Sequence, residues 1–201
     1  MPSPVVTVIG DLVGSRRSPD RAQLQRWLGE SLSEVNANVA TVQAFEPTVG
    51  DEFQGTCPTV ADATVAALLV RLALRGRGDV RCGIGVGEVT VHDETRTPLL
   101  QDGPGWWAAR DAIETVERAR GSRRTWYVGP GAGTINAYLL CRDQVVARLN
   151  DRGARMLRLA LLGHSQRDIA EREGVYPSAV SQQFSRGITT VLEAQRLMAQ
   201  A

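Results

Sequence analysis

The sequence predicts an α/β sandwich of the ferredoxin-like kind followed by an all-α domain. Residues 1–130 alternate between β-branched runs and helix-spaced apolar residues, in the order strand, helix, hairpin, helix, strand, helix, strand. That mixed order favours a partly antiparallel sheet. Residues 131–201 carry only helical patterns, and the breaker-rich stretch 128–133 lies between the two parts. We therefore expect two domains, at 1–130 and 131–201.

Residues 1–130 contain local signals for several elements, taken here in chain order. A β-branched run at 5–9 predicts a buried strand that ends at Gly10 and Asp11. Asp20 is a suitable N-cap for the next helix, whose apolar positions recur from 24 to 39. Gly50 and Asp51 form a hairpin-turn signature. The remaining predicted elements are a helix at 60–74, a strand at 80–91, a helix at 106–118 and a strand at 124–128.

The composition is that of a folded globular chain. Of 201 residues, 43% are hydrophobic and 22% charged, which supports a core and disfavours disorder. No apolar run reaches the roughly 20 residues of a membrane span, so we expect no membrane partner. Met1 to Pro4 show no secretory signal. Cys57, Cys82 and Cys141 are unclustered, which is typical of a reducing compartment and predicts a cytoplasmic protein.

Arginine is the only basic residue type apart from histidine, since the chain contains no lysine. Codon usage in a GC-rich genome explains this most simply. Any phosphate must nevertheless be held by guanidinium groups, backbone N–H groups or metal. Residues 1–130 carry 14 arginines and 16 acids, whereas residues 131–201 carry nine arginines and six acids. The second part therefore has a modest positive surplus.

The second part contains a helix-turn-helix pattern at 165–186, between helices expected at 135–149, 156–162 and 187–198. Ser165 is an N-cap, Gly174 provides the positive φ of a tight turn, and Pro177 fits the first turn of the second helix. This arrangement leaves a polar face outward, formed by Ser178, Ser181, Gln182, Ser185 and Arg186. Such residues meet base edges and phosphates in DNA-reading units. A helical bundle used for protein contact is the alternative.

Residues 162–181 resemble the helix-turn-helix of sigma-factor region 4 and LuxR-type regulators. Tyr176 stands where those families usually have a Ser or Thr cap. The resemblance implies a DNA partner and a homodimer, because one recognition helix covers only a short half-site. The apolar residues of the last helix could bury surface between subunits or within the bundle, namely Ile188, Val191, Leu192 and Leu197.

Two carboxylates of the first part are candidates for chemistry. Asp11 follows a buried strand, and Asp51 lies on a hairpin turn that neighbouring strands would bring beside it. Paired carboxylates repel each other and favour a cation such as Mg²⁺, which can hold a triphosphate. Alternatively, both are turn residues that cap backbone N–H groups. The loop 15–18 is a phosphate-binding candidate or a solvated basic loop.

Four segments resemble class III nucleotide cyclases in the same order along the chain. Residues 11–15 are similar to the first metal motif, and residues 48–53 to the hairpin with the second metal aspartate, or to the diguanylate cyclase G-G-D-E-F turn. Residues 81–89 and 108–110 resemble the cyclase strand and the helix that carries the transition-state arginine. The resemblance implies a nucleotide-cyclase-type sandwich with Mg or Mn ion and a purine nucleotide. It assigns metal ligands to Asp11 and Asp51, a catalytic role to Arg110, and nucleotide binding to Gly14, Ser15, Arg16, Gly50 and Arg110.

Two departures from the cyclase pattern argue against cyclic nucleotide synthesis. Trp106 replaces the asparagine four residues before the arginine, and Pro47 replaces the purine-selecting lysine. The whole chain most resembles the SatD family, through residues 10–15, 50–55, 83–88, 102–104 and the C-terminal helix-turn-helix. We expect a DNA-binding transcriptional regulator with a nucleotide-binding, cyclase-like domain. Alternatives are an active metal-dependent nucleotidyl transferase or cyclase whose helical domain mediates assembly, and a protein-interaction module.

Overall fold

The computed structural model describes residues 4–93 and 95–200, and it confirms a mixed α/β fold. Met1, Pro2 and Ser3, which form part of the segment in which we expect no secretory signal, lie outside the described residues. The elements are β1 (Val5–Leu12), η1 (Ser15–Arg17), α1 (Arg21–Asn38), β2 (Gln43–Pro47), β3 (Glu52–Cys57), α2 (Val60–Ala73), β4 (Val80–Gly87), β5 (Thr90–Asp93), β6 (Leu100–Asp102), α3 (Pro104–Glu117), β7 (Thr125–Val128), α4 (Ala132–Arg148), α5 (Asp151–Leu161), α6 (Gln166–Glu173), α7 (Pro177–Gln183), η2 (Phe184–Ile188) and α8 (Thr189–Met198).

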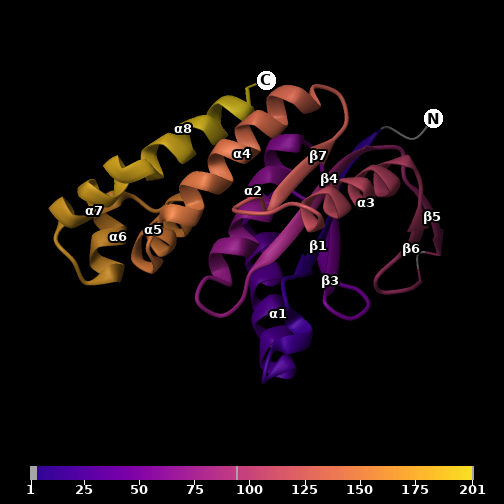
Figure 1. Cartoon of the computed structure of the whole chain (residues 1–201), viewed down its shortest axis with the longest axis horizontal. Helices are drawn as coiled ribbons and strands as arrows, with labels where there is room; N and C mark the ends of the chain where they lie inside the picture. Colours follow the sequence, from indigo (N-terminus) through magenta and orange to yellow (C-terminus); the bar gives the residue numbers. More distant parts are fainter. Residues whose placement is uncertain (1–3, 94, 201) are drawn as a thin grey trace.

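The main sheet has five strands in the order β2-β3-β1-β4-β7 (Figure 1). All neighbours are antiparallel except β4 and β7, which are parallel. The first six principal elements therefore run β-α-β-β-α-β, as in ferredoxin-like folds, and β7 extends the sheet at one edge. The expected partly antiparallel sheet is confirmed.

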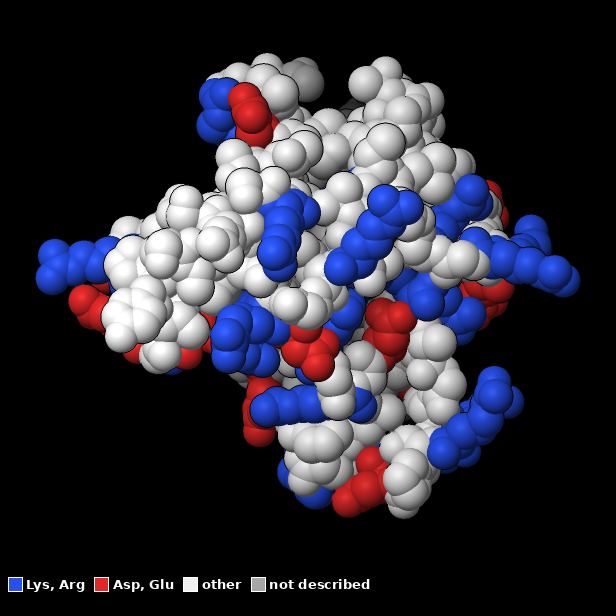
Figure 2. All heavy atoms as spheres, turned by 60° about the vertical axis from the view of Figure 1, so that its left-hand side comes forward, with Lys and Arg blue, Asp and Glu red and all other residues white. Residues whose placement is uncertain are grey.

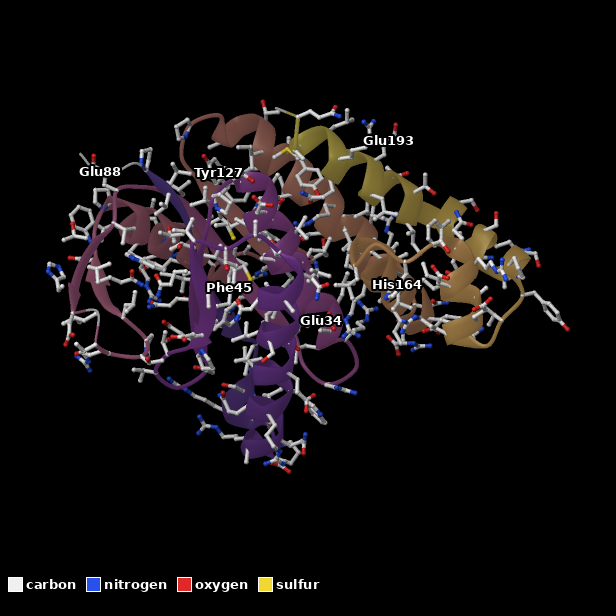
Figure 3. The ribbon with its side chains drawn as sticks, turned by 180° about the vertical axis from the view of Figure 1, so that it is seen from behind. Glu34, Phe45, Glu88, Tyr127, His164 and Glu193 are labelled. Atoms are coloured by element: carbon white, nitrogen blue, oxygen red, sulfur yellow. The ribbon has the colours of Figure 1, made fainter. Side chains whose placement is uncertain are left out.

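Alternation along β1 divides the core between two faces of the sheet. Val6, Val8 and Leu12 belong to the large core that includes apolar residues of α1 and α2. Ile9 packs instead against α3 residues, and the Thr7 hydroxyl donates to the Gly105 carbonyl at 2.7 Å. Figures 1 and 3 show α1 and α3 on opposite sides of the sheet. Asp11, which also has an odd number, consequently lies on the α3 face.

The glycine run of β4 lets α3 pack directly on the sheet. A Cβ added to Gly83 would lie 2.2 Å from the Ala109 carbonyl oxygen, and one added to Gly85 would lie 2.3 Å from the Ala109 nitrogen. These distances are far below van der Waals contact, so larger residues would push the helix away. Close helix–sheet approach accounts for these glycines.

Both edges of the main sheet are closed by asparagine side chains. In α1, the Asn36 amide accepts from the Phe45 N–H at 2.7 Å and donates to the Phe45 carbonyl at 2.9 Å. In α4, Asn136 makes the same pair of bonds with Tyr127, at 2.9 and 2.8 Å. Phe45 and Tyr127 lie on the outermost strands, β2 and β7 (Figure 3). Each side chain therefore supplies the hydrogen bonds that a further strand would supply.

The C-terminal helices pack against the α/β segment through α4, which contacts β7, and through α8, which contacts α2. The buried carboxylate of Asp143 accepts from the backbone N–H groups of Arg124 and Thr125, at 2.6 and 2.8 Å, where β7 begins. It also accepts from the Arg71 guanidinium of α2 at 3.1 Å. The side chain of Gln195 in α8 donates to the Ala61 carbonyl of α2 at 3.1 Å. The helical segment and the α/β segment thus share buried polar contacts.

One sequence expectation needs correction. The strand expected at 80–91 ends at Gly87, and residues beyond it form β5, which pairs with β6 in a separate two-stranded ribbon. The chain leaves the sheet there because the Glu88 carbonyl accepts the Gly105 N–H at the start of α3. Of the two uses predicted for the apolar residues of the last helix, packing within the bundle is favoured for Ile188 and Val191, which are buried inside this chain, whereas Leu197 is 53% exposed.

The cysteines are all free, with Cys57 and Cys82 buried and Cys141 exposed. Burial, with a smaller contribution from Asp62, raises the pKa of the Cys57 thiol to about 12, so this group stays protonated at neutral pH. No helix in the described ranges is long and apolar enough to cross a membrane.

Replacing Asp143 by alanine is expected to lower the free energy of unfolding by about 3–5 kcal/mol, because the buried guanidinium groups of Arg71 and Arg142 and two backbone N–H groups lose their acceptor. Urea denaturation measures this change. Asp151→Ala is the control, since Asp151 is 71% exposed in its ion pair with Arg75 and its loss should cost less than about 1 kcal/mol. Equal losses in the two variants would contradict the role given to Asp143.

Candidate functional site

The candidate site lies where β1, β3 and β4 end beside α3. Asp11 is the second last residue of β1 and not a residue beyond it, because the strand continues to Leu12. Its partners in register are Glu52 of β3 and Arg81 of β4. Side chains opposite each other in neighbouring strands lie on the same face, so the three charged groups meet under α3.

Asp11 is engaged by an arginine. Arg81 donates to both Asp11 carboxylate oxygens, from Nε at 2.9 Å and from Nη2 at 2.6 Å. Only 13% of the Asp11 side chain is exposed, and Arg81 also lies 3.1 Å from Glu117 of α3. The hydrogen bond to Asp11 raises the pKa of Arg81. A two-point bond of this kind is among the strongest polar contacts in proteins.

Arg110 makes a second ion pair at the same end of the sheet. Its two amino groups donate to the two Glu52 carboxylate oxygens at 2.8 and 2.9 Å. The pair is more open than the first, with 46% of the Arg110 side chain and 35% of Glu52 exposed. The bond to Glu52 raises the pKa of Arg110. The residue expected to act on a nucleotide is therefore held by a carboxylate of the hairpin.

Asp51 lies in the turn before β3, next to the end of β1. Its backbone carbonyl accepts the Leu12 N–H at 3.1 Å, and its carboxylate accepts a short hydrogen bond from the buried hydroxyl of Ser15. Gln25 of α1 donates to the Gly50 carbonyl at 2.8 Å. The turn and the loop after β1 are thus tied together, which brings Asp51 beside the same strand end as Asp11.

As arranged, these residues do not fit a resident divalent cation. Both oxygens of Asp11 are occupied by Arg81, and the carboxylate of Asp51 is bonded to Ser15. No group of three or more His, Cys, Asp or Glu side chains in the described part of the chain could hold a metal ion. A cation would have to displace a guanidinium from Asp11.

The other candidates near the strand end are open to solvent. Gly14 has a φ of 71°, a left-handed conformation in which glycine is favoured, and Arg16 is exposed in η1. Gly50 has a φ of 76° in the exposed hairpin turn. In α3, Trp106 is buried against the sheet, whereas Trp107 is 58% exposed. Trp106 therefore belongs to the core and Trp107 to its solvent-exposed rim. Gly14, Ser15, Arg16, Gly50 and Arg110 remain predicted nucleotide-binding residues, of which Ser15 is buried.

The C-terminal candidates lie on one exposed surface. α6 begins with a capping box between Ser165 and Asp168 and ends at Gly174, with a φ of 62°. α7 begins at Pro177 after Tyr176, whose side chain makes no cap. Val180 and Phe184 are buried. The five predicted DNA-contacting residues are exposed: Ser178, Ser181, Gln182, Ser185 and Arg186.

Sequence reasoning missed the partners that occupy the site. The sequence motifs predict Glu52 only as part of a hairpin turn and Arg81 only as part of a strand. Alternation could have indicated Glu52, since a residue opposite Asp11 in a neighbouring strand lies on the same face. Nothing in the sequence placed Glu117 of α3 against Arg81.

The fold is similar to that of nucleotide cyclases. A bacterial light-regulated adenylyl cyclase matches with a TM-score of 0.50 and 9% identity, over 62% of this chain and 43% of that chain. An EAL/GGDEF domain protein from M. capsulatus matches with a TM-score of 0.44 and 16% identity, over 64% and 86%. The catalytic core of a rhodopsin-guanylyl cyclase in complex with ATPalphaS matches with 0.41 and 21%, over 56% and 72%. The chain thus spans less than half of the adenylyl cyclase, and the similarity concerns the fold alone.

These features define a cyclase-like α/β protein with a C-terminal helical segment. A search of curated proteins found no sequence match. The sequence profile of the SatD family matches residues 5–124, which is more than half of the chain. The protein belongs to the SatD family.

Replacing Arg81 by glutamine is expected to raise the affinity for Mn²⁺, because the guanidinium that competes for Asp11 is removed. Isothermal titration calorimetry of the full chain measures this affinity. Arg118→Gln is the matched control, since Arg118 pairs with Glu114 on the exposed surface of α3. If Arg81→Gln and the wild type bind Mn²⁺ equally, Arg81 does not control access to Asp11.

Proposed function

We propose that this SatD-family protein is a DNA-binding transcriptional regulator whose cyclase-like part, residues 1–130, binds a nucleotide. The observation that carries the proposal is the surface of α7, where the buried residue Val180 fixes the helix and a polar face stays open. Contact with base edges needs short polar side chains on an exposed, well-anchored helix. In this division, residues 131–201 contact DNA.

The turn between α6 and α7 supports this proposal. The capping box at Ser165 and the left-handed Gly174 fix where α6 begins and ends. The N–H of Val175 bonds to the Ala170 carbonyl at 3.0 Å, which closes the turn. A rigid pair of helices lets the second one enter a major groove without further ordering.

The charge of the helical segment supports a nucleic acid partner. Residues 131–201 have three more arginines than acids, and Arg186 is exposed in η2, which directly follows α7. Guanidinium–phosphate contacts provide affinity without sequence preference, whereas the polar side chains of α7 provide the preference. We propose a homodimer, because two half-sites give the affinity that one such helix lacks.

A nucleotide ligand is supported by the strand end beside α3. Arg110 and Arg16 present guanidinium groups to solvent near the left-handed Gly14 and Gly50. Phosphate oxygens can exchange for the Glu52 carboxylate on Arg110, since both bind a guanidinium in two-point geometry. A Mg or Mn ion would accompany the nucleotide only if Arg81 leaves Asp11.

An active metal-dependent nucleotidyl transferase or cyclase is the second candidate. It is favoured by one observation, that Asp11 and Arg110 come to the same end of the sheet and that the Asp51 backbone bonds to Leu12 there. Incubation with Mn²⁺ and each nucleoside triphosphate, followed by mass spectrometry, separates the candidates. A cyclic or transferred product supports the enzyme, and unchanged nucleotide supports the regulator.

The melting temperature is expected to rise with a purine nucleotide, because a ligand that binds only the folded state stabilises it. Arg110→Gln should reduce this rise. Arg118→Gln, a change of the same kind on the same helix, should leave the rise intact. Thermal shift assays with ATP and GTP provide the measurement. No rise with either nucleotide in the wild type contradicts nucleotide binding.

DNA binding is expected to weaken steeply as salt increases, because arginine–phosphate contacts release counterions. Gln182→Ala should relax sequence preference at a cost of roughly 1–3 kcal/mol. Arg186→Ala should weaken binding to all sequences. Genomic fragments selected by pull-down are compared with random duplex in gel shifts.

Arg118→Ala, an exposed arginine outside the helical segment, is the control for Arg186→Ala. If the wild type retains no fragment better than random duplex, the regulator proposal fails and the helical segment is better explained as a protein-contact module.

A further inference from the structure

A polar cavity of about 290 Å³ lies at the junction between the α/β segment and the C-terminal helices. It is bounded by α1, by the end of α2 with the turn after it, and by α5. Figure 2 shows arginine and acidic side chains interspersed over this junction. The charged residues of the lining are Arg75, Arg77, Arg155, Arg158, Glu30 and Glu34. None of them takes part in the function proposed above.

Two arginines of α5, Arg155 and Arg158, are each held by a carboxylate that accepts from one edge of the guanidinium group. Arg158 donates from Nε and Nη2 to the Glu34 carboxylate of α1, and Figure 3 shows Glu34 on the side of α1 that faces the C-terminal helices. Arg155 donates from Nε at 2.9 Å and Nη2 at 2.8 Å to Glu173 of α6. These two-point bonds fix the plane of each guanidinium.

The two arginines that follow α2 are fixed as well. Arg75 donates from Nε to Asp151 at 3.1 Å and from Nη2 to the Leu149 carbonyl at 2.7 Å. The Arg77 guanidinium lies 5.2 Å from the centre of the Trp27 ring. Arg77 forms no ion pair with any described residue. Stacking on an indole orients it while leaving its N–H groups open.

Three of these arginines leave the same donor atom, Nη1, without a partner in the described part of the chain. In Arg75, Arg155 and Arg158 the protein uses Nε and Nη2, and Nη1 donates to no acceptor among the residues that the structure describes. With Arg77, four oriented guanidinium groups therefore offer unused N–H groups at one cavity. Oriented guanidinium N–H groups bind the charged oxygens of a phosphate better than the oxygen of a neutral group.

The spread of the unused donors favours a ligand with several phosphate groups. The four arginines are matched by four acids in or beside the lining, Glu30, Glu34, Asp151 and Glu173, so binding must come from the unused N–H groups and not from an excess of positive charge. A single phosphate carries only about two negative charges near neutral pH. Linked phosphates carry more and span several arginines at once. The cavity volume corresponds to about ten molecules of liquid water, each occupying about 30 Å³, which leaves room for such a chain.

We propose that this cavity binds a compound with two or more linked phosphates, free or attached to a nucleoside. The ligand bridges α1 and α2 of the cyclase-like part to α5 of the helical segment. The site is separate from the strand end that carries Arg110, so this proposal does not depend on the function proposed above.

The wild-type full chain is titrated with sodium tripolyphosphate in buffer free of divalent metal, using isothermal titration calorimetry. Binding at a one-to-one ratio, tighter than that of inorganic phosphate, is expected. A titration with ATP identifies the source: tighter binding than tripolyphosphate supports a nucleotide ligand, and weaker binding supports inorganic polyphosphate. No binding of tripolyphosphate, or equal affinity for inorganic phosphate, overturns the proposal.

Arg77→Gln is the principal variant, because it removes a guanidinium from the cavity without breaking an ion pair. It should weaken tripolyphosphate binding about tenfold, as expected for the loss of one charge-assisted hydrogen bond. Arg155→Gln should act in the same direction. Each variant's melting temperature without ligand shows that it is folded.

One control and one comparison locate the site. Arg118→Gln, on the exposed surface of α3, should keep wild-type affinity for tripolyphosphate, and Arg110→Gln shows whether the strand end contributes to binding. Loss of binding in Arg110→Gln with full binding in Arg77→Gln overturns the proposal, because the ligand would then bind at the strand end. Failure of the DNA experiments leaves these outcomes unaffected.

Discussion

The buried carboxylate of Asp143 is the interaction on which the packing of both halves depends. A charge can stay in the interior only when its lone pairs are all used, and here two arginines and two backbone N–H groups use them. The N–H groups belong to the start of β7, and Arg71 belongs to α2. One residue of α4 thereby fixes the last strand of the sheet against the helix on its face. The C-terminal helices follow from the position of α4, with Gln195 as a second anchor.

The elements with strong local signals could be predicted from the sequence, and those that depend on distant partners could not. Asp20 caps α1 and Gly174 ends α6 as expected, because both signals lie within a few residues of the feature that they determine. β5 and β6 escaped prediction because they are short and stabilise only each other. The pairing of Arg81 with Asp11 depends on strand register, and that of Arg110 with Glu52 depends on where α3 crosses the sheet. Neither the strand register nor the position of α3 can be predicted from composition or periodicity.

At the strand end beside α3, the charged side chains of the protein are paired with one another. Arg81 and Arg110 each already have a carboxylate partner, and Asp11 and Asp51 each already have a donor. Removing one partner leaves the other without compensation, so a ligand must exchange both charges of a pair. The Glu52–Arg110 pair also attaches α3 to β3, and the contact between Arg81 and Glu117 attaches α3 to β4. A ligand that replaces these contacts therefore changes how α3 is attached to the sheet. The glycines of β4 allow α3 to lie directly on the sheet.

The asparagine side chains at the two sheet edges limit how copies of this protein can associate. An uncovered outer strand is a template on which another chain can add a strand, in ordered assembly or in aggregation. Asn36 and Asn136 already use the outward N–H and C=O groups of Phe45 and Tyr127, in the middle of each outer strand. A continuous sheet across two molecules would require breaking these bonds first. Both edges of the main sheet are thus protected, at the centre of the outer strand, against strand addition by a second copy.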